Sequence, residues 1–401
     1  MAFHYLFTTI TKHSLKPYFL SKTPIFSLLQ TSLFSTSFLI TKTPKKFKKK
    51  RQKPSPRNTL VQHPSSLITH FENLVNRDNF FRFLTRSKQF LAKQPEHILR
   101  LDDAGKLYRQ LGFPRGRKVN KFVDNHPRIF EIYRHENNKM WLGFTEFMEN
   151  LLQEEVKIME SMELERVKVV KKLLMMSKDK KMALSKIYHC RLIFGVPEDF
   201  RDWILKFSDD FRVVIGDDGS RMLELVKWDP ALALSALERE FMVDEEKVKK
   251  AFKFPVKHGK ELDLEDDDVR RLNLLNTLPL VSPYSDGWKH ELSSLEAEKY
   301  RVGVIHEFLS LTLEKKASIH HIVEFKEEFS LTKHTYQMLK KQPRTFYLAG
   351  TEMNWVVFLK DGYDENGNLI QKDPQVVFNE RLYRFAQMQY PGELCRDSIS
   401  E

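Results

Sequence analysis

The residues of this sequence best suited to covalent chemistry are the adjacent pair His189-Cys190. A thiol hydrolase needs a base that faces its nucleophile, but adjacent side chains of a helix point about 100° apart. We therefore expect Cys190 to be a small buried core residue and not a nucleophile. The other of the two cysteines, Cys395, lies in a polar tail, so the sequence predicts neither a disulfide scaffold nor a cysteine-rich zinc module.

The sequence also gives little support for a metal site or a nucleotide-binding site. The pair His320-His321 lacks the four-residue spacing that places two ligands on one helix face, so we expect no metal site there. The run Asp266-Asp267-Asp268 would suit metal-assisted RNA cleavage, but further acids just before it favour a solvated acidic loop. No glycine-rich nucleotide-binding loop is present. The sequence thus predicts a protein that is not an enzyme and that uses no cofactor or metal.

Anion binding is the chemistry that the charges favour. The net charge is +12, and residues 1–60 carry 12 Lys and Arg with no acid. The remaining residues hold 54 side chains of each sign, with 25 basic and 16 acidic ones over residues 61–191 and an acidic excess after them. This asymmetry between the two halves, and not the overall charge, indicates a nucleic-acid-binding surface in the first half.

The imbalance is sharpest over residues 166–191, with nine basic side chains and one acid, Asp179. A solvated helix face normally carries both signs, so this excess indicates an anion-binding surface. The stretch begins on an amphipathic helix predicted over residues 151–176, whose apolar stripe leaves Lys168, Lys171 and Lys172 projecting outward.

The candidate RNA-contacting cations fall into two groups, one around the first repeated unit and one leading into the second. Arg128 follows Pro127, so it has an alternative interpretation as a structural helix end, and three tyrosines (Tyr108, Tyr133 and Tyr188) are weaker candidates for stacking on bases. The candidates are Arg115, Arg117, Lys118, Lys121 and Arg128 in the first group, and Lys168, Lys171, Lys172, Lys178, Lys180, Lys181, Lys186 and Arg191 in the second.

The elements that must position these cations recur three times. A helix followed by a short β-hairpin is predicted in units at about residues 97–145, 182–228 and 317–360. Phe130, Phe211 and Phe346 open the hairpins, and we expect their rings to hold each hairpin against its helix. The sequence therefore predicts an α+β fold, mainly helical with short β-hairpins, built from tandem winged-helix-like units within residues 71–390.

The first 40 residues have the composition of an organellar transit peptide, rich in Ser and Thr and free of acids. The stretch Thr23 to Thr41 is uncharged but too polar for a membrane span, so we expect no stable membrane insertion. A segment like a mitochondrial processing site, Leu33 to Ser37, favours the mitochondrion, whereas the absence of Arg before Arg51 favours the chloroplast as the alternative. We expect residues 41–70 to form a basic arm and residues 391–401 a polar tail.

Several long blocks resemble the plant organelle RNA recognition (PORR) domain family, and they follow the family's order from about Asn73 to Phe385. The resemblance implies a nuclear-encoded plant protein that binds intron RNA in an organelle and promotes group II intron splicing without catalytic residues of its own. The main blocks are Arg117-Lys118-Val119, Pro127-Arg128-Ile129-Phe130-Glu131, Phe194-Gly195-Val196-Pro197, Lys227-Trp228-Asp229-Pro230, Leu278-Pro279-Leu280-Val281 and Glu298-Lys299-Tyr300-Arg301.

Two other functions stay open. Winged-helix units also read duplex DNA, which would make the chain an organellar transcription factor. The acidic second half would instead suit a protein adaptor in a ribosomal or splicing complex. Other splicing factors are possible partners, and the sequence leaves the oligomeric state open, because the helix at residues 151–176 suits either a coiled coil or packing within its own domain.

Overall fold

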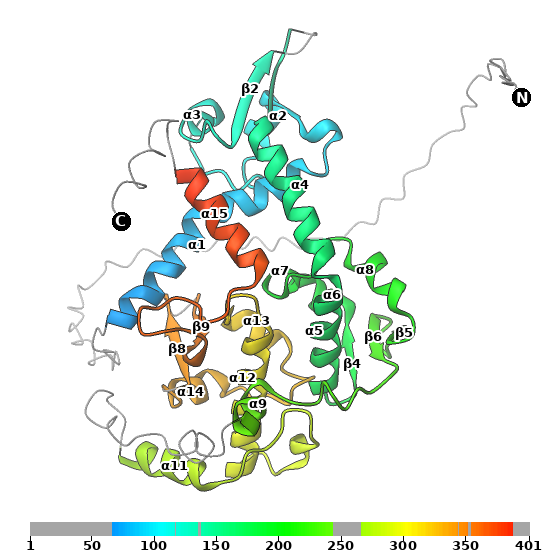
Figure 1. The fold of residues 1–401 in the computed structure, drawn as a ribbon, viewed down its shortest axis with the longest axis vertical. Helices are drawn as coiled ribbons and strands as arrows, with labels where there is room; N and C mark the ends of the chain where they lie inside the picture. Colours follow the sequence, from blue (N-terminus) through cyan, green and yellow to red (C-terminus); the bar gives the residue numbers. More distant parts are fainter. Residues whose placement is uncertain are drawn as a thin grey trace, which may run out of the picture. The chain divides into compact units, whose positions relative to one another are not determined.

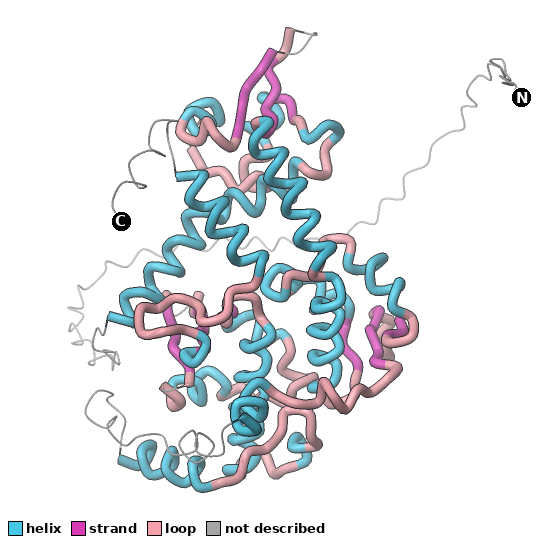
Figure 2. The backbone as a smooth tube through the Cα atoms, in the orientation of Figure 1, coloured by secondary structure: helices cyan, strands magenta, loops and turns pink. Residues whose placement is uncertain are grey.

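The computed structural model describes residues 66–116, 118–134, 138–243, 266–343, 345–351 and 354–387 (Figures 1 and 2). The predicted transit peptide, nearly all of the basic arm, the polar tail, Cys395 and Arg117 lie outside these residues. No helix within the described ranges is long and apolar enough to cross a membrane.

Within the described residues three small antiparallel sheets recur, and each follows a long helix. Every sheet has the strand order first, third, second, so the hairpin lies beside a short strand from before its helices. The first unit comprises α1 (Ser66–Leu91), β1 (Leu99–Arg100), α2 (Leu101–Lys106), α3 (Val119–Asp124), β2 (Phe130–Arg134) and β3 (Met140–Phe144). The α4 helix (Glu146–Ser161) leads out of it.

The second and third units repeat this order. The second comprises α5 (Glu163–Met176), β4 (Lys181–Ala183), α6 (Leu184–His189), α7 (Arg191–Phe194), α8 (Phe200–Trp203), β5 (Phe211–Ile215) and β6 (Arg221–Leu225). The third comprises α12 (Leu295–Leu311), β7 (Lys316–Ser318), α13 (Ile319–Glu324), α14 (Thr335–Lys340), β8 (Phe346–Ala349) and β9 (Val356–Leu359). Between or after them lie α9 (Ala236–Val243), α11 (Asp266–Thr277) and α15 (Pro374–Gln387).

The α+β fold predicted from the sequence is confirmed, and the three phenylalanines explain why the units resemble one another. Phe130, Phe211 and Phe346 are the first residues of β2, β5 and β8, and all three are buried. They pair with Phe144, Leu225 and Leu359, the last residues of the partner strands. The short first strands were not predicted, because two or three residues are too few to show alternation.

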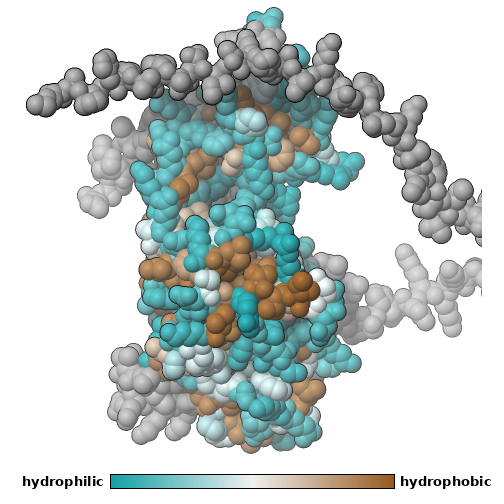
Figure 3. Space-filling view, turned by 90° about the vertical axis from the view of Figure 1, so that its right-hand side faces the viewer, coloured by the Kyte–Doolittle hydropathy of each residue, from teal (hydrophilic) through white to brown (hydrophobic). Residues whose placement is uncertain are grey.

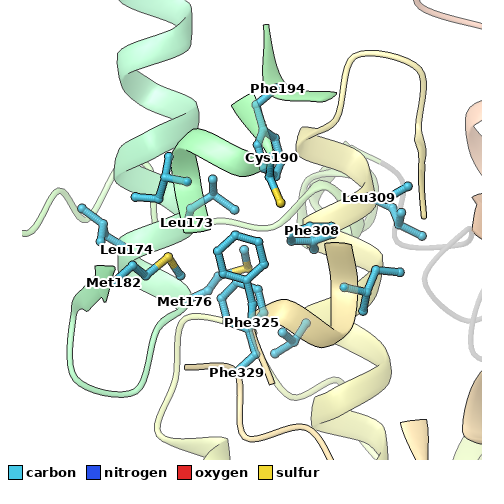
Figure 4. Close-up of a cluster of buried hydrophobic side chains, with 14 of the residues drawn as sticks. Leu173, Leu174, Met176, Met182, Cys190, Phe194, Phe308, Leu309, Phe325 and Phe329 are labelled. Carbon is cyan, nitrogen blue, oxygen red and sulfur yellow. The ribbon is translucent and has the colours of Figure 1, made fainter. Parts of the chain in front are cut away.

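Two large apolar cores hold these units. One joins α1, α4 and α15 to the first sheet, and in it the rings of Phe81 of α1 and Tyr383 of α15 stack with their centroids 4.5 Å apart. The other is shared by the second and third units, and Figure 4 shows residues of α5 and α7 meeting α12 and Phe325 in it. The second and third units are therefore halves of one packed body, since neither buries its apolar face alone.

Two predictions about helices were wrong. The single helix expected over residues 151–176 is broken at Met162 (φ −97°, ψ 4°), where α4 ends and α5 begins. The apolar stripe is likewise discontinuous: Val156 is 53% exposed, whereas Val170 is buried. The acidic run at residues 266–268 is not a loop but the first turn of α11, where the positive end of the helix dipole favours carboxylates.

Candidate nucleic-acid interface

The first candidate group lies on and just before α3. Val119, Phe122 and Val123 are buried, and this helical spacing turns the side chains of Lys118 and Lys121 outward. Lys118 is the N-cap residue, with extended backbone (φ −64°, ψ 137°).

A tight loop before α3 carries Arg115 to the surface. The loop turns through Gly112 (φ +75°), whose position has Phe83 Cα only 2.9 Å from where a Cβ would lie. A side chain at this position would therefore clash with α1, so the loop needs glycine. Gly116 (φ +80°) has open space around it, and Arg115 is exposed beside it.

Arg115, Lys118 and Lys121 are exposed and, among the residues that the structure describes, none of them forms an ion pair. Cations without an acidic partner keep their full charge for a ligand's phosphates. Arg128 is different: it is half-buried, and its guanidinium carbon lies 5.5 Å from the centre of the Phe385 ring of α15. Its packing on Phe385 suits a structural role, but Arg128 lies four residues beyond the end of α3 (Val119–Asp124) and does not end that helix.

Three lysines of the second candidate group, Lys168, Lys171 and Lys172, were predicted to project outward, and for Lys171 and Lys172 this is wrong. Both side chains are buried. Lys171 Nζ lies 2.8 Å from Asp210 Oδ1, and Lys172 Nζ lies 2.8 Å from Glu307 Oε1. A buried charge is tolerated in a protein interior only when it is paired. Each of these two lysines therefore forms a structural ion pair with its carboxylate.

Glu307 sits at the centre of a buried polar network. Its side chain is 0% exposed and accepts hydrogen bonds from Lys172, from the Tyr284 hydroxyl (2.6 Å) and from the Ala236 backbone N–H (2.7 Å). Burial by itself raises the pKa of the Glu307 carboxyl, but the charge of Lys172 and these hydrogen bonds outweigh it and hold the pKa below its usual value.

Most other cations of the second group are engaged as well. Lys180 donates to the Met175 carbonyl (2.7 Å), lies 5.2 Å from the Trp228 ring, and has its pKa lowered by burial. Lys178 is exposed, 4.9 Å from the Trp288 ring. The remaining four are paired: Lys168 with Glu165 (2.7 Å), Lys181 with Glu224 (3.0 Å), Lys186 with Glu328 (2.7 Å) and Arg191 with Glu198 (3.6 Å).

The acidic second half therefore neutralises much of the basic stretch over residues 166–191. Asp210, Glu224, Glu307 and Glu328 come from 39 or more residues further along the chain. Figure 3 shows apolar side chains gathered on one face of the molecule, the side on which Figure 1 places α8, β5 and β6. Exposed apolar residues of this region include Leu205 and Ile215, which suit phosphate contact poorly.

The structure also brings together groups that the sequence separated. Cys190 is buried, as predicted, and burial raises the pKa of its thiol, so a nucleophilic thiolate is disfavoured. However, His321, whose spacing argued against a metal site, lies beside it. The ligand atoms of His189, Cys190 and His321 are all within 4.8 Å of one another.

The family is decided by the match between this chain and the model of the plant organelle RNA recognition (PORR) domain, which covers residues 68–390. The chain belongs to this family. No solved structure matches the PORR chain.

Several curated relatives share the PORR region. "WHAT'S THIS FACTOR 1 homolog, chloroplastic" from Oryza sativa subsp. japonica is 34% identical over 78% of this chain and 63% of its own length. From Arabidopsis thaliana, "ROOT PRIMORDIUM DEFECTIVE 1" is 28% identical over 84% of this chain and 86% of its own length. "WHAT'S THIS FACTOR 9, mitochondrial", from the same plant, is 26% identical over 75% of this chain and 79% of its own length. The chain spans less than two thirds of the first relatives it matches.

Two exposed arginines near α3 were missed by the reasoning from sequence. Arg86 of α1 donates to the Arg109 carbonyl (3.5 Å), and the Arg109 guanidinium lies 5.8 Å from the centre of the Tyr108 ring. The signal available for Arg86 is its spacing from Arg82, four residues earlier on the face of α1 that does not carry the buried phenylalanines; no comparable signal points to Arg109. Together with the α3 cations they enlarge the basic surface of the first PORR unit.

Proposed function

We propose that this chain is a non-catalytic RNA-binding protein of a plant organelle that promotes group II intron splicing by holding intron RNA in its folded form. The PORR match over residues 68–390 is the observation that carries this proposal. Mitochondrial location is the finer proposal, supported by the segment Leu33 to Ser37, which resembles a mitochondrial processing site. The relatives bear chloroplastic and mitochondrial names.

The RNA-contacting surface that we propose is the first unit, centred on Arg115, Lys118 and Lys121. These cations point outward from a short helix and its leading loop, and they have no acidic partner within the described ranges. An arginine can grip a phosphate with two donors or stack on an unpaired base, whereas a lysine contributes a point charge. This surface binds the irregular or single-stranded segments of an intron and leaves the chemistry to the RNA.

Binding promotes splicing by mass action. An intron that interconverts between misfolded and splicing-competent forms shifts toward whichever form the protein binds more tightly, by an amount equal to the difference in binding free energy. No step of this mechanism needs a nucleophile or a metal from the protein.

Two triple variants with the same change in charge test the surface. Arg115→Gln/Lys118→Gln/Lys121→Gln removes the unpaired cations, and Lys168→Gln/Lys181→Gln/Lys186→Gln removes cations that are ion-paired. Each phosphate contact to a single strand contributes about 0.7 to the slope of log affinity against log salt. The first triple should therefore lose affinity for intron RNA and flatten this slope by about 2, whereas the second should change it by less than about 1.

Equal effects of the two triples, or an unchanged slope in the first, would overturn the proposed surface. The function itself is tested by sequencing the RNA that co-purifies with the protein from organelles, where unspliced introns should be enriched. A broad ribosomal profile would support an adaptor instead, and tighter binding to duplex DNA than to intron RNA in competition would support a transcription factor.

A further inference from the structure

The helices α6 and α13 occupy the same place in the second and third units, directly after the first strand of each sheet. His189 is the last residue of α6 and Glu324 is the last residue of α13. Their side chains meet, with His189 Nδ1 2.6 Å from Glu324 Oε2. Equivalent ends of two repeated helices therefore face each other.

Further donor atoms converge on this contact. Cys190, the C-cap of α6, has its Sγ 3.8 Å from Glu324 Oε2. His321 is the third residue of α13, and its ring lies edge-on to that of His189, with centroids 5.4 Å apart. The contact thus gathers two imidazoles, one thiol and one carboxylate from two units of the fold.

One of these donors lacks the partner that its burial requires. His321 Nδ1 is buried, and among the described residues it has no hydrogen-bond partner. Buried polar atoms usually have a partner, and this ring nitrogen, beside a thiol and a second imidazole, is therefore available to a metal ion.

We propose that His189, Cys190, His321 and Glu324 bind a divalent transition metal, with Zn²⁺ as the ion that this set suits best. Thiolate and imidazole donors favour zinc over magnesium or calcium, and four donors match its tetrahedral coordination. Zn–N and Zn–S bonds of about 2.1 and 2.3 Å place ligand atoms roughly 3.5 Å apart. The ligand atoms of His189, Cys190 and His321 lie within 4.8 Å of one another. Glu324 lies outside that group, with Oε2 2.6 Å from His189 Nδ1 and 3.8 Å from Cys190 Sγ, so its carboxylate would turn toward the ion on binding.

Binding would convert the Cys190 thiol to a thiolate and release its proton to the solvent. The thiolate and the Glu324 carboxylate together balance the two positive charges of the ion, so no net charge is left in a half-buried site. Because the ligands come from α6 and α13, the metal would cross-link the second and third units. Its role is to stabilise this junction.

The test is a titration of the full chain, freed of metal with a chelator, first with Co²⁺ and then with Zn²⁺. We expect one equivalent of Co²⁺ to produce a thiolate-to-cobalt charge-transfer band and the visible bands of a tetrahedral ion, and Zn²⁺ to displace it. Cys190→Ser should abolish the charge-transfer band. His321→Gln should weaken binding by at least about tenfold, the loss typical of removing even an outer-shell partner.

His189→Gln and His320→Gln form a matched pair on the surface of the two helices. The His189 side chain is 64% exposed, so its replacement should leave the fold intact while weakening binding by about tenfold or more. His320 is exposed on α13 next to His321 and is not one of the proposed ligands, so its replacement should leave the metal affinity unchanged. Absence of the charge-transfer band in the wild-type protein, or equal affinities of these two variants, would overturn the proposal.

Discussion

Replacing Lys172 by methionine separates a folding role from an RNA-binding role for the basic stretch. Methionine keeps most of the volume but leaves the Glu307 carboxylate, 0% exposed, with only the Tyr284 hydroxyl and the Ala236 N–H as donors. Removing one partner of a buried ion pair costs about 3–5 kcal/mol. Since two hydrogen bonds remain, we expect the free energy of unfolding to fall by about 3 kcal/mol.

The stability that Lys172→Met loses should depend on pH. In the wild-type protein the pKa of Glu307 is held low, so its ionised form stabilises the fold at neutral pH, and this stability is lost as the pH falls through the low folded-state pKa. Without Lys172, burial dominates and raises that pKa above the unfolded value. The penalty then applies where the carboxylate is ionised and is relieved on acidification, so the two proteins should differ less at pH 5 than at pH 7.

Urea unfolding at both pH values, together with RNA affinity at pH 7, checks these expectations. Lys168→Met is the matched control, because Lys168 lies on the same helix but is exposed, and an exposed pair contributes at most about 1 kcal/mol. Adding Glu307→Gln to Lys172→Met should restore part of the stability by removing the stranded charge. If Lys172→Met unfolds like the control yet loses RNA affinity, the structural role assigned here is wrong.

Two further predictions concern stability. Gly195 and Gly219 both have left-handed backbone (φ +67° and +77°), so replacement by alanine should cost about 1–2 kcal/mol of stability at each. Gly195→Ala should cost about 1–3 kcal/mol more, because its Cβ would lie 2.7 Å from Arg166 Nε and displace that side chain. Equal urea midpoints for the two variants would contradict this difference. Burial lowers the pKa of Lys299 to about 8. The unfolded chain therefore binds more protons than the folded one between pH 8 and 10, so the free energy of unfolding should rise with pH, by about 1 kcal/mol because water screens this partly exposed ammonium. The same rise in Lys299→Met would refute that origin.

The hairpins show what local pattern can predict. Phe130, Phe211 and Phe346 were recognised because each opens a strand after a helix, and strand alternation and turn composition are properties of consecutive residues. The break at Met162 was missed because helix propensity on either side of it is high, and packing overrides local preference there.

The candidate surface shows where prediction from sequence ends. The exposure of Lys118 and Lys121 follows from their spacing against Val119, Phe122 and Val123, which is a local pattern. That these two lysines have no acidic partner among the described residues does not follow from a local pattern. It depends on which acidic side chains the fold brings near them.

Acidic residues far along the chain determine which cations of the second group are neutralised. Lys172 and Glu307 are 135 positions apart, and nothing near either residue indicates that they meet in the core. The same distance in sequence separates His189 from Glu324, so the cluster at the end of α6 was invisible to any argument from ligand spacing.

By itself, the sequence determined the three repeated units, the family, and the outward-facing lysines of α3, because helical and strand periodicity and turn chemistry act over a few neighbouring residues. Only the tertiary structure decided which cations stay available to a ligand and which donor atoms come together. Coulombic attraction and coordination depend on distance in space, and that distance between residues far apart along the chain is set by how the units pack.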